Sequence, residues 1–255
     1  MSGHSKWSQI KRQKGVADAK RGQLFTKLGR ELVVSARAGG PDPDGNARLR
    51  MAVARAREAN MPMDTIDRAI KRGAGAADGP ALEEIVYEGY GPGGVALLVE
   101  AMTDNRNRTV AEVRNALSRG GGSLGESGCV SWLFDNRGVI VMHGDAETLE
   151  TIALESIDAG AEDFAITDDT LEIYSNPSGL DEVRSSLEQR GIKIDSADLA
   201  MIPKSTIALE AKEAMSTLRL MERLEDLDDV QRVYSNIEMS DSLLSEFEAS
   251  ASSAH

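Results

Sequence analysis

The chain of 255 residues has one cysteine, and only 4% of its residues are aromatic. Cys129 cannot form an internal disulfide and has no partner thiols for a metal cluster. Because aromatic residues are scarce, hydrophobic cores must be built from Leu, Ile, Val, Ala and Met, and a hydrophobic content of 41% is sufficient for them. No apolar run approaches the roughly 18 to 20 residues of a membrane span, and the N-terminus does not resemble a secretory signal. These absences favour a folded cytoplasmic protein.

Residues typical of catalytic centres are also sparse. His4, His143 and His255 are scattered along the chain, and Cys129 has the character of a small strand residue. The pair at 168–169 and the acidic run at 222–229 lack the spacing of a metal-binding loop. We therefore expect no enzymatic activity, no cofactor and no metal site.

The charge is divided unevenly along the chain. Residues 1–75 contain sixteen lysines and arginines against seven aspartates and glutamates, a balance of +9, whereas the remainder carries −22. A nucleic-acid backbone is a dense negative polymer, so locally clustered cations matter more than the net charge of −13. The asymmetry favours a basic binding segment on an acidic body. The alternative is that the charges only solvate two surfaces.

The basic segment is predicted to be helical. Helices are expected over about residues 17–38, 46–59 and 62–73. In the first of them Leu28 and Leu32 share an apolar side, and most lysines and arginines lie opposite. Three short helices with this much positive charge predict a small bundle that binds an anionic partner. The Gly- and Ala-rich stretch that follows is typical of a linker.

From residue 84 the apolar pattern changes to that of strands separated by helices. One βαββαβ unit, the ferredoxin-like order, is expected with strand 138–143, helix 146–158, strands 162–167 and 170–175, helix 180–190 and strand 197–203. The flanking segments repeat the order with strand 95–103, helix 109–119, strand 129–134, strand 205–210, helix 212–224 and strand 230–237, after a further strand at 84–90. The predicted fold class is α+β, an N-terminal three-helix domain followed by two ferredoxin-like α/β domains, one inserted in the other.

These elements also predict domain boundaries and loops. The expected divisions are a basic helical domain at 1–78, an outer α/β domain at 79–135 and 205–240, an inserted domain at 136–204, and a disordered tail at 241–255. Gly89–Gly94 lies between two strands and lacks a following Gly-Lys-Ser/Thr, so it is interpreted as a turn rather than a phosphate loop. Gly120–Gly128 is expected to be a mobile loop.

Several long motifs resemble the YebC/PmpR family of bacterial regulatory proteins and its mitochondrial translation-activator relatives. They are Gly3-His4-Ser5-Lys6-Trp7, Asp18-Ala19-Lys20-Arg21-Gly22, Phe25-Thr26-Lys27-Leu28, Arg30-Glu31-Leu32, Tyr87-Glu88-Gly89-Tyr90-Gly91-Pro92-Gly93-Gly94 and Thr103-Asp104-Asn105-Arg106-Asn107-Arg108-Thr109. The resemblance runs from about residue 2 to residue 240. It implies a cytoplasmic protein of three domains that acts in transcription as a DNA-binding regulator or, in other lineages, on translation with the ribosome. Lys11-Arg12-Gln13-Lys14 departs from the family's usual His-Arg-Lys but keeps the positive charge.

Thirteen side chains are candidate nucleic-acid contacts. Lysines and arginines bind phosphates, and Trp7 is a candidate for stacking on an unpaired base. Two arginines lie where a strand meets a helix N-terminus, whose free N–H groups attract anions. The candidates are Lys6, Trp7, Lys11, Arg12, Lys14, Lys20, Arg21, Lys27, Arg30, Arg48, Arg55, Arg106 and Arg108.

Each candidate group has a structural alternative. The basic cluster is alternatively a flexible arm with Trp7 packed against the helices. The loop at 104–109 is alternatively a tightly hydrogen-bonded connection in which Asn105 and Asn107 satisfy backbone groups.

The sequence therefore predicts a nucleic-acid-binding regulator of gene expression, and a DNA-binding transcriptional regulator is the first interpretation. The partner would then be promoter DNA and the transcription machinery. The first alternative is a ribosome-associated translation factor that binds ribosomal RNA, where splayed bases are available for stacking. It is considered because the sequence shows no clear helix-turn-helix or zinc finger. The second alternative is a protein–protein adaptor without nucleic-acid contact.

Overall fold

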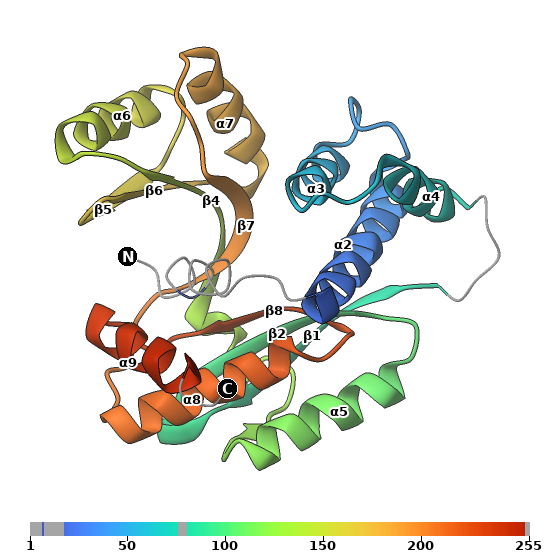
Figure 1. Ribbon diagram of the computed structural model, residues 1–255, viewed down its shortest axis with the longest axis vertical. Coiled ribbons are helices and arrows are strands. Elements are labelled where there is room, and N and C mark those ends of the chain that lie inside the picture. The colour runs from blue at the N-terminus through green and yellow to red at the C-terminus, as the bar shows by residue number, and fades with distance from the viewer. Residues whose placement is uncertain (1–6, 8–17, 76–80, 253–255) are drawn as a thin grey trace. The chain divides into compact units, whose positions relative to one another are not determined.

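The computed structural model describes Trp7 and residues 18–75 and 81–252, which form two compact units (Figure 1). The inserted unit contains Trp132–Thr206 and Trp7. The outer unit contains the described residues of 13–131 and 207–255, so its chain is interrupted by the inserted unit. The fold is α+β, with N-terminal helices followed by two four-stranded sheets.

The outer unit begins with three helices, α2 (Asp18–Gly39), α3 (Ala47–Glu58) and α4 (Met63–Gly73). Their common core includes Leu32, Leu49 and Ile66, which are fully buried. Asn46 caps α3 by accepting a 3.0 Å bond from the Leu49 amide, and its own side-chain amide donates to carbonyls at the end of α2. The cap thus fixes the turn between α2 and α3, and the three expected helices are confirmed.

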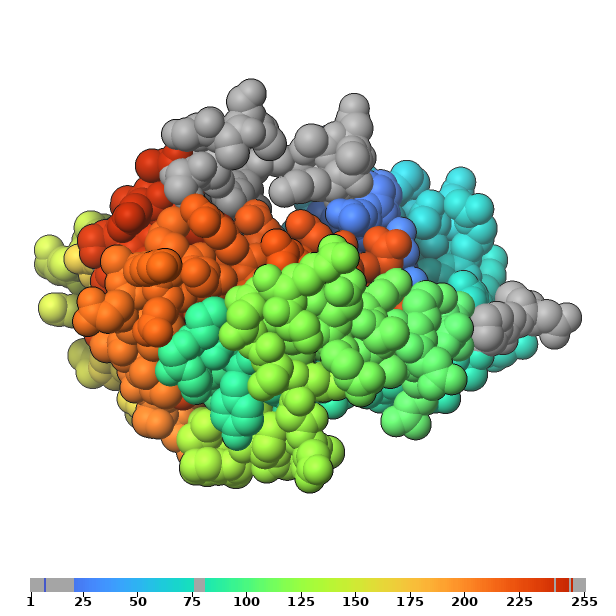
Figure 2. All heavy atoms as spheres, turned by 90° about the horizontal axis from the view of Figure 1, so that it is seen from below, coloured from blue at the N-terminus to red at the C-terminus, as the bar shows by residue number. Residues whose placement is uncertain are grey.

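The sheet of the outer unit has the antiparallel order β3-β1-β2-β8. Its strands are β1 (Glu83–Tyr90), β2 (Ala96–Thr103), β3 (Ser123–Leu124) and β8 (Val230–Ser235). Helices α5 (Arg106–Arg119) and α8 (Ala211–Glu225) lie side by side on one face of the sheet (Figure 2). Leu117 of α5 and Leu218 of α8 are buried in this layer.

The inserted unit has the ferredoxin-like topology that the sequence predicts. In chain order it contains β4 (Phe134–His143), α6 (Ala146–Asp158), β5 (Asp163–Thr167), β6 (Thr170–Ser175), α7 (Leu180–Gln189) and β7 (Ser196–Pro203). The sheet order is β5-β6-β4-β7, with antiparallel neighbours throughout. Its core includes the fully buried Ile140, Ile173 and Leu187.

Two strands expected in the outer unit are not formed. Residues 129–133 make a turn and the short 3₁₀ helix η2 (Ser131–Leu133) in place of a strand. The cause is Glu88, whose carboxylate is buried. It accepts hydrogen bonds from the backbone N–H groups of Gly128, Val130 and Ser131 at 2.7–2.8 Å, and these bonds hold residues 128–131 in a curved conformation around the carboxylate. Residues 205–210 contribute only one isolated bridge, between Ile207 and Ile237. In the sheet, β1 lies beside β2, at a position that a ferredoxin-like order would give to one of these two missing strands.

The glycine-rich segments between these elements are closely packed. The turn expected at Gly89–Gly94 connects β1 and β2 and contains the 3₁₀ turn η1 (Pro92–Gly94), but Gly89 and Tyr90 are the last residues of β1. Gly120–Gly128 was expected to be a mobile loop, but β3 pairs with β1 within it. A Cβ atom on Gly122 would lie only 2.4 Å from the carbonyl oxygen of Tyr90, so glycine here allows two backbones to approach.

The expectation of a disordered tail at 241–255 is wrong for its described part. Residues Asp241–Ser252 form α9, and the remaining three residues lie outside the described chain. Leu244 and Phe247, three positions apart, are buried on one side of this helix, which packs on α8. Ser240 accepts a bond from the Leu243 amide in the first turn. A short apolar stripe in a polar sequence is therefore sufficient to dock the helix.

Candidate nucleic-acid interface

Part of the predicted cluster lies outside the described residues. These candidates are Lys6, Lys11, Arg12 and Lys14, and Lys20 lies in α2 without a described side chain. Trp7 is 1% exposed, so its ring is covered in this structure and reaches a base only after it moves. Arg21 is exposed near the start of α2.

Two predicted contacts on α2 are engaged with the rest of the outer unit. Lys27 donates its ammonium proton to the carbonyl of Glu225, and Arg30 donates to the carbonyl of Asp228. These carbonyls lie at the end of α8 and just after it, where the helix dipole is negative. Both side chains therefore fasten α2 to the connection between α8 and β8.

Asp229 is the centre of a buried polar network at the same connection. Its carboxylate is 2.9 Å from Arg30 and 2.8 Å from Arg108, and it accepts bonds from Thr103 at 3.0 Å and Thr109 at 2.7 Å. Burial disfavours the charged carboxylate, but the hydrogen bonds and the nearby Arg30 charge outweigh this and lower the pKa of Asp229. The loop before α5 is thus a hydrogen-bonded connection, with Asn105 as the N-cap of the helix.

Three further candidates on the outer unit lie beside carboxylates. Arg48 pairs with Glu84, and this contact raises the pKa of the guanidinium. Arg55 pairs with Glu31 on α2. Arg106 is exposed and lies 3.7 Å from a glutamate at the start of β1. A carboxylate partner cancels much of the field that attracts a phosphate, so these arginines contribute less to an anion-binding surface than their number suggests.

A different set of basic side chains is not paired with any carboxylate of the described residues. Within the described ranges no ion pair involves Arg37, Arg57, Arg68, Lys71 or Arg72. All except Arg72, which is half-buried, are exposed. Most of them lie in the last turns of α2, α3 and α4, where cations also stabilise the negative helix end.

The candidate contacts predicted from the sequence do not include this second set. A signal was present, because Arg37, Arg57 and Arg72 have no acidic residue three or four positions away along the helix. Which cations lack a partner from another element is decided only by the tertiary fold, as the pairing of Arg48 with β1 illustrates.

The described part of the chain offers little for other kinds of site. No three His, Cys, Asp or Glu side chains in it converge as metal ligands would. Over the same residues, no helix has the length and apolar character needed to cross a membrane.

Comparison with known proteins places these features in a family. The model of the "TACO1/YebC protein N-terminal domain" matches residues 5–76, and that of the "TACO1/YebC second and third domain" matches residues 82–237. A "probable transcriptional regulatory protein" of Trichlorobacter lovleyi is 53% identical over 240 residues, which cover 94% of this chain and 97% of the relative. One of Dehalococcoides mccartyi is 50% identical over 251 residues, covering 98% and 100%.

A solved structure supports the same assignment. The crystal structure of a conserved hypothetical protein from Aquifex aeolicus superposes with a TM-score of 0.80 at 46% identity, covering 88% of this chain and 93% of that one. The helical segment, the two sheets and the sequence matches over nearly the whole chain agree, and this protein belongs to the TACO1/YebC family.

Proposed function

We propose that this protein is a nucleic-acid-binding regulator of gene expression that acts on DNA as a transcriptional regulator. The observation that carries the proposal is the set of basic side chains on α2–α4 that have no carboxylate partner among the described residues. They lie in a segment whose charge balance opposes that of the remaining chain. Such cations neutralise backbone phosphates and release counterions. The bacterial relatives carry the name "probable transcriptional regulatory protein", which supports a regulatory role.

The proposed contact is with the backbone rather than with base edges. Arg37, Arg57 and Lys71 are exposed at helix ends, and phosphate contacts of this kind position a protein on its polymer without reading sequence. The acidic remainder of the chain repels the same polymer and so restricts binding to the basic helices. Selection of a target would then depend on the shape of the nucleic acid or on partner proteins.

Fluorescence anisotropy of a labelled DNA duplex, and of an RNA of the same sequence, tests the proposal. The double variant Arg57→Gln/Lys71→Gln is expected to bind more weakly, and the slope of log affinity against log salt, measured between about 50 and 200 mM, should fall by about 1 to 2. The matched control is Arg137→Gln/Arg190→Gln in the inserted unit, where both arginines are paired with glutamates. It removes the same charge and should leave the slope unchanged.

The outcomes separate the candidate functions. Tighter binding to DNA than to RNA supports the transcriptional regulator, and a clear preference for RNA favours the ribosome-associated translation factor. Replacing Lys11, Arg12 and Lys14 with glutamate extends the test to candidates outside the described residues. If neither these charge reversals nor the double variant alters binding, the nucleic-acid proposal is wrong and the protein–protein adaptor takes its place.

A further inference from the structure

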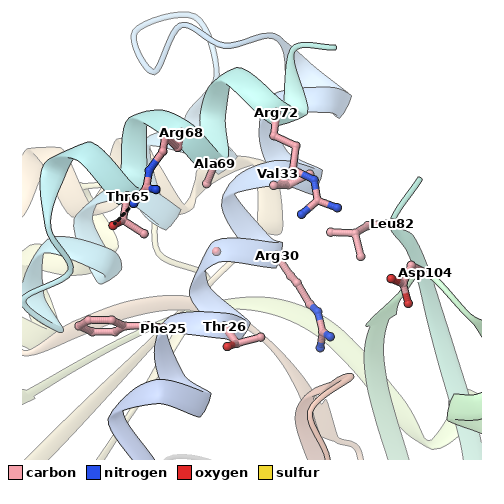
Figure 3. Close-up of a pocket in the computed structure, with 11 residues that line it drawn as sticks. Phe25, Thr26, Arg30, Val33, Thr65, Arg68, Ala69, Arg72, Leu82 and Asp104 are labelled. Carbon is pink, nitrogen blue, oxygen red and sulfur yellow. Dashed lines mark hydrogen bonds between the residues drawn. The ribbon is translucent and has the colours of Figure 1, made fainter. Parts of the chain in front are cut away.

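A cavity of about 500 Å³ lies between α2 and α4 in the outer unit (Figure 3). The residue before β1 and the loop after β2 line a further side, through Leu82 and Asp104, and the cavity is open to solvent. Its volume is within the roughly 300–1,000 Å³ typical of small-ligand sites. Neither the proposed backbone contacts nor the fold itself accounts for a hollow of this size beside a helical core.

The two ends of the cavity differ in chemistry. Phe25 lies at one end, and the guanidinium groups of Arg30 and Arg72 extend into the other, where Leu82 and Asp104 also lie (Figure 3). An aromatic ring offers a flat face to a planar group, whereas guanidinium groups bind phosphate or carboxylate oxygens. The arrangement fits an elongated ligand with an anionic end and a planar, weakly polar end.

Two of the charges in the cavity are compensated by the protein. Arg30 is paired with Asp229, and the Asp104 carboxylate is 2.9 Å from Arg108. Because Asp229 also binds Arg108, the four side chains form a neutral network. Asp104 therefore adds no net negative charge that would repel an anion.

The remaining two cations have no carboxylate partner in the part of the chain that the structure describes. Arg68 donates to a backbone carbonyl at 3.1 Å and to the Thr65 hydroxyl at 3.2 Å, and both acceptors are neutral. Among the described residues, Arg72 has no hydrogen-bonding or ionic partner for its side chain. These two arginines are four positions apart on α4, a spacing at which like charges destabilise a helix. An anion bound at Arg72 would weaken this repulsion and give Arg72 a partner, which it lacks among the described residues.

We propose that this cavity binds a nucleotide unit, with its phosphate at Arg72 and its base against Phe25. The unit has two possible sources, a free nucleoside phosphate or a nucleotide of a bound nucleic acid. The second source rests on the proposed function, but the two tests are separable, because Arg57 and Lys71, which test that function, do not line the cavity.

Binding of AMP, ATP and a 5′-phosphorylated tetranucleotide to the full-length protein tests the site by isothermal titration calorimetry. Saturable binding is expected for at least one probe, and Arg72→Gln should weaken it about tenfold, as expected for the loss of a charged hydrogen bond. The matched control, Arg57→Gln, removes an equivalent arginine from the last turn of α3 and should change the affinity less than about twofold. Phe25→Leu should weaken nucleotide binding but not the binding of inorganic phosphate.

Thermal unfolding of each variant establishes that the substitutions leave the protein folded. Competition then identifies the source of the ligand. If the DNA or RNA of the anisotropy assay displaces the bound nucleotide, the cavity holds a unit of the nucleic acid; if it does not, the cavity holds a free nucleoside phosphate. Absence of saturable binding by all three probes, or equal binding by the folded Arg72→Gln variant, overturns the proposal. Neither result affects the test of nucleic-acid binding, which depends on the Arg57→Gln/Lys71→Gln variant.

Discussion

Asp229 is the residue on which three segments of the outer unit converge. It receives bonds from the end of β2 and the start of α5, and an ion pair from Arg30 on α2. Its side chain is 2% exposed, so loss of its charge leaves two guanidinium groups without their buried acceptor. A single carboxylate thus determines that Arg30 and Arg108, two candidate phosphate contacts, serve the fold.

We expect Asp229→Asn to lower the free energy of unfolding by about 2 kcal/mol at neutral pH, because hydrogen bonds to a charged group are lost. The pKa of Asp229 is lowered in the folded state. Its contribution is therefore fully present above the unfolded pKa of about 3.9 and is lost as the pH falls through the folded value. Urea unfolding at several pH values should show the difference between wild type and variant shrinking below about pH 4.

The neighbouring substitution Asp228→Asn is the control for this prediction. Asp228 is exposed and contributes only its backbone carbonyl to Arg30. Its replacement should have little effect on stability at any pH. If both variants lost the same free energy of unfolding, negative charge near the end of α8 would stabilise the fold, rather than the buried hydrogen bonds of Asp229.

At the scale of elements, the helices and strands of the inserted unit were predictable from the sequence because each has a clear apolar period and a local stop or cap. Asp145, for example, caps α6 as expected by accepting a bond from the Thr148 amide. The errors have a common origin in contacts between elements. Glu88 on β1 determines the conformation of residues 128–131, and the surface of α8 holds α9. Neither partner lies close in the sequence to the segment it shapes.

Gly73 illustrates how element packing overrides helix propensity. A Cβ atom there would lie 2.4 Å from the carbonyl oxygen of Val33 and 2.8 Å from the Cβ atom of Ala36, because α4 lies directly against α2. Replacing a helical glycine by alanine ordinarily stabilises a helix by up to about 1 kcal/mol. Here we expect Gly73→Ala to destabilise the protein by about 1–3 kcal/mol in thermal or urea unfolding, since the helices must separate.

Gly22 on α2 provides the opposite case. A Cβ atom at this position would meet nothing within 4 Å, and the residue is exposed. Gly22→Ala should therefore be neutral or stabilise the protein by about 0.5–1 kcal/mol. If both alanine variants proved stabilising, the close packing of α4 on α2 would be contradicted.

At the scale of the whole molecule, two compact units have separate cores, and within the described ranges the chain passes between them at residues 131–132 and 206–207. We expect Ile173→Ala, which removes a fully buried side chain from the inserted sheet, to cost about 3 kcal/mol. Hydrogen exchange in mild denaturant should show faster exchange in β4–β7, while β1 and β2 stay protected. Val86→Ala, at a half-exposed strand position of the other sheet, should change neither region. Equal loss of protection in both sheets would mean that the units unfold as one.

The sequence by itself determined the α+β class, the order of helices and strands, and the concentration of positive charge in the first 75 residues. These features depend on local periodicity and composition, which are properties of short stretches of consecutive residues. Only the tertiary structure decided which arginines are paired and where a cavity forms. Arg48 meets Glu84 and Arg30 meets Asp229 because distant elements pack together, whereas Arg72 has no such neighbour among the described residues. Ion pairing depends on distances of a few ångströms, and those distances are fixed only when the chain is folded.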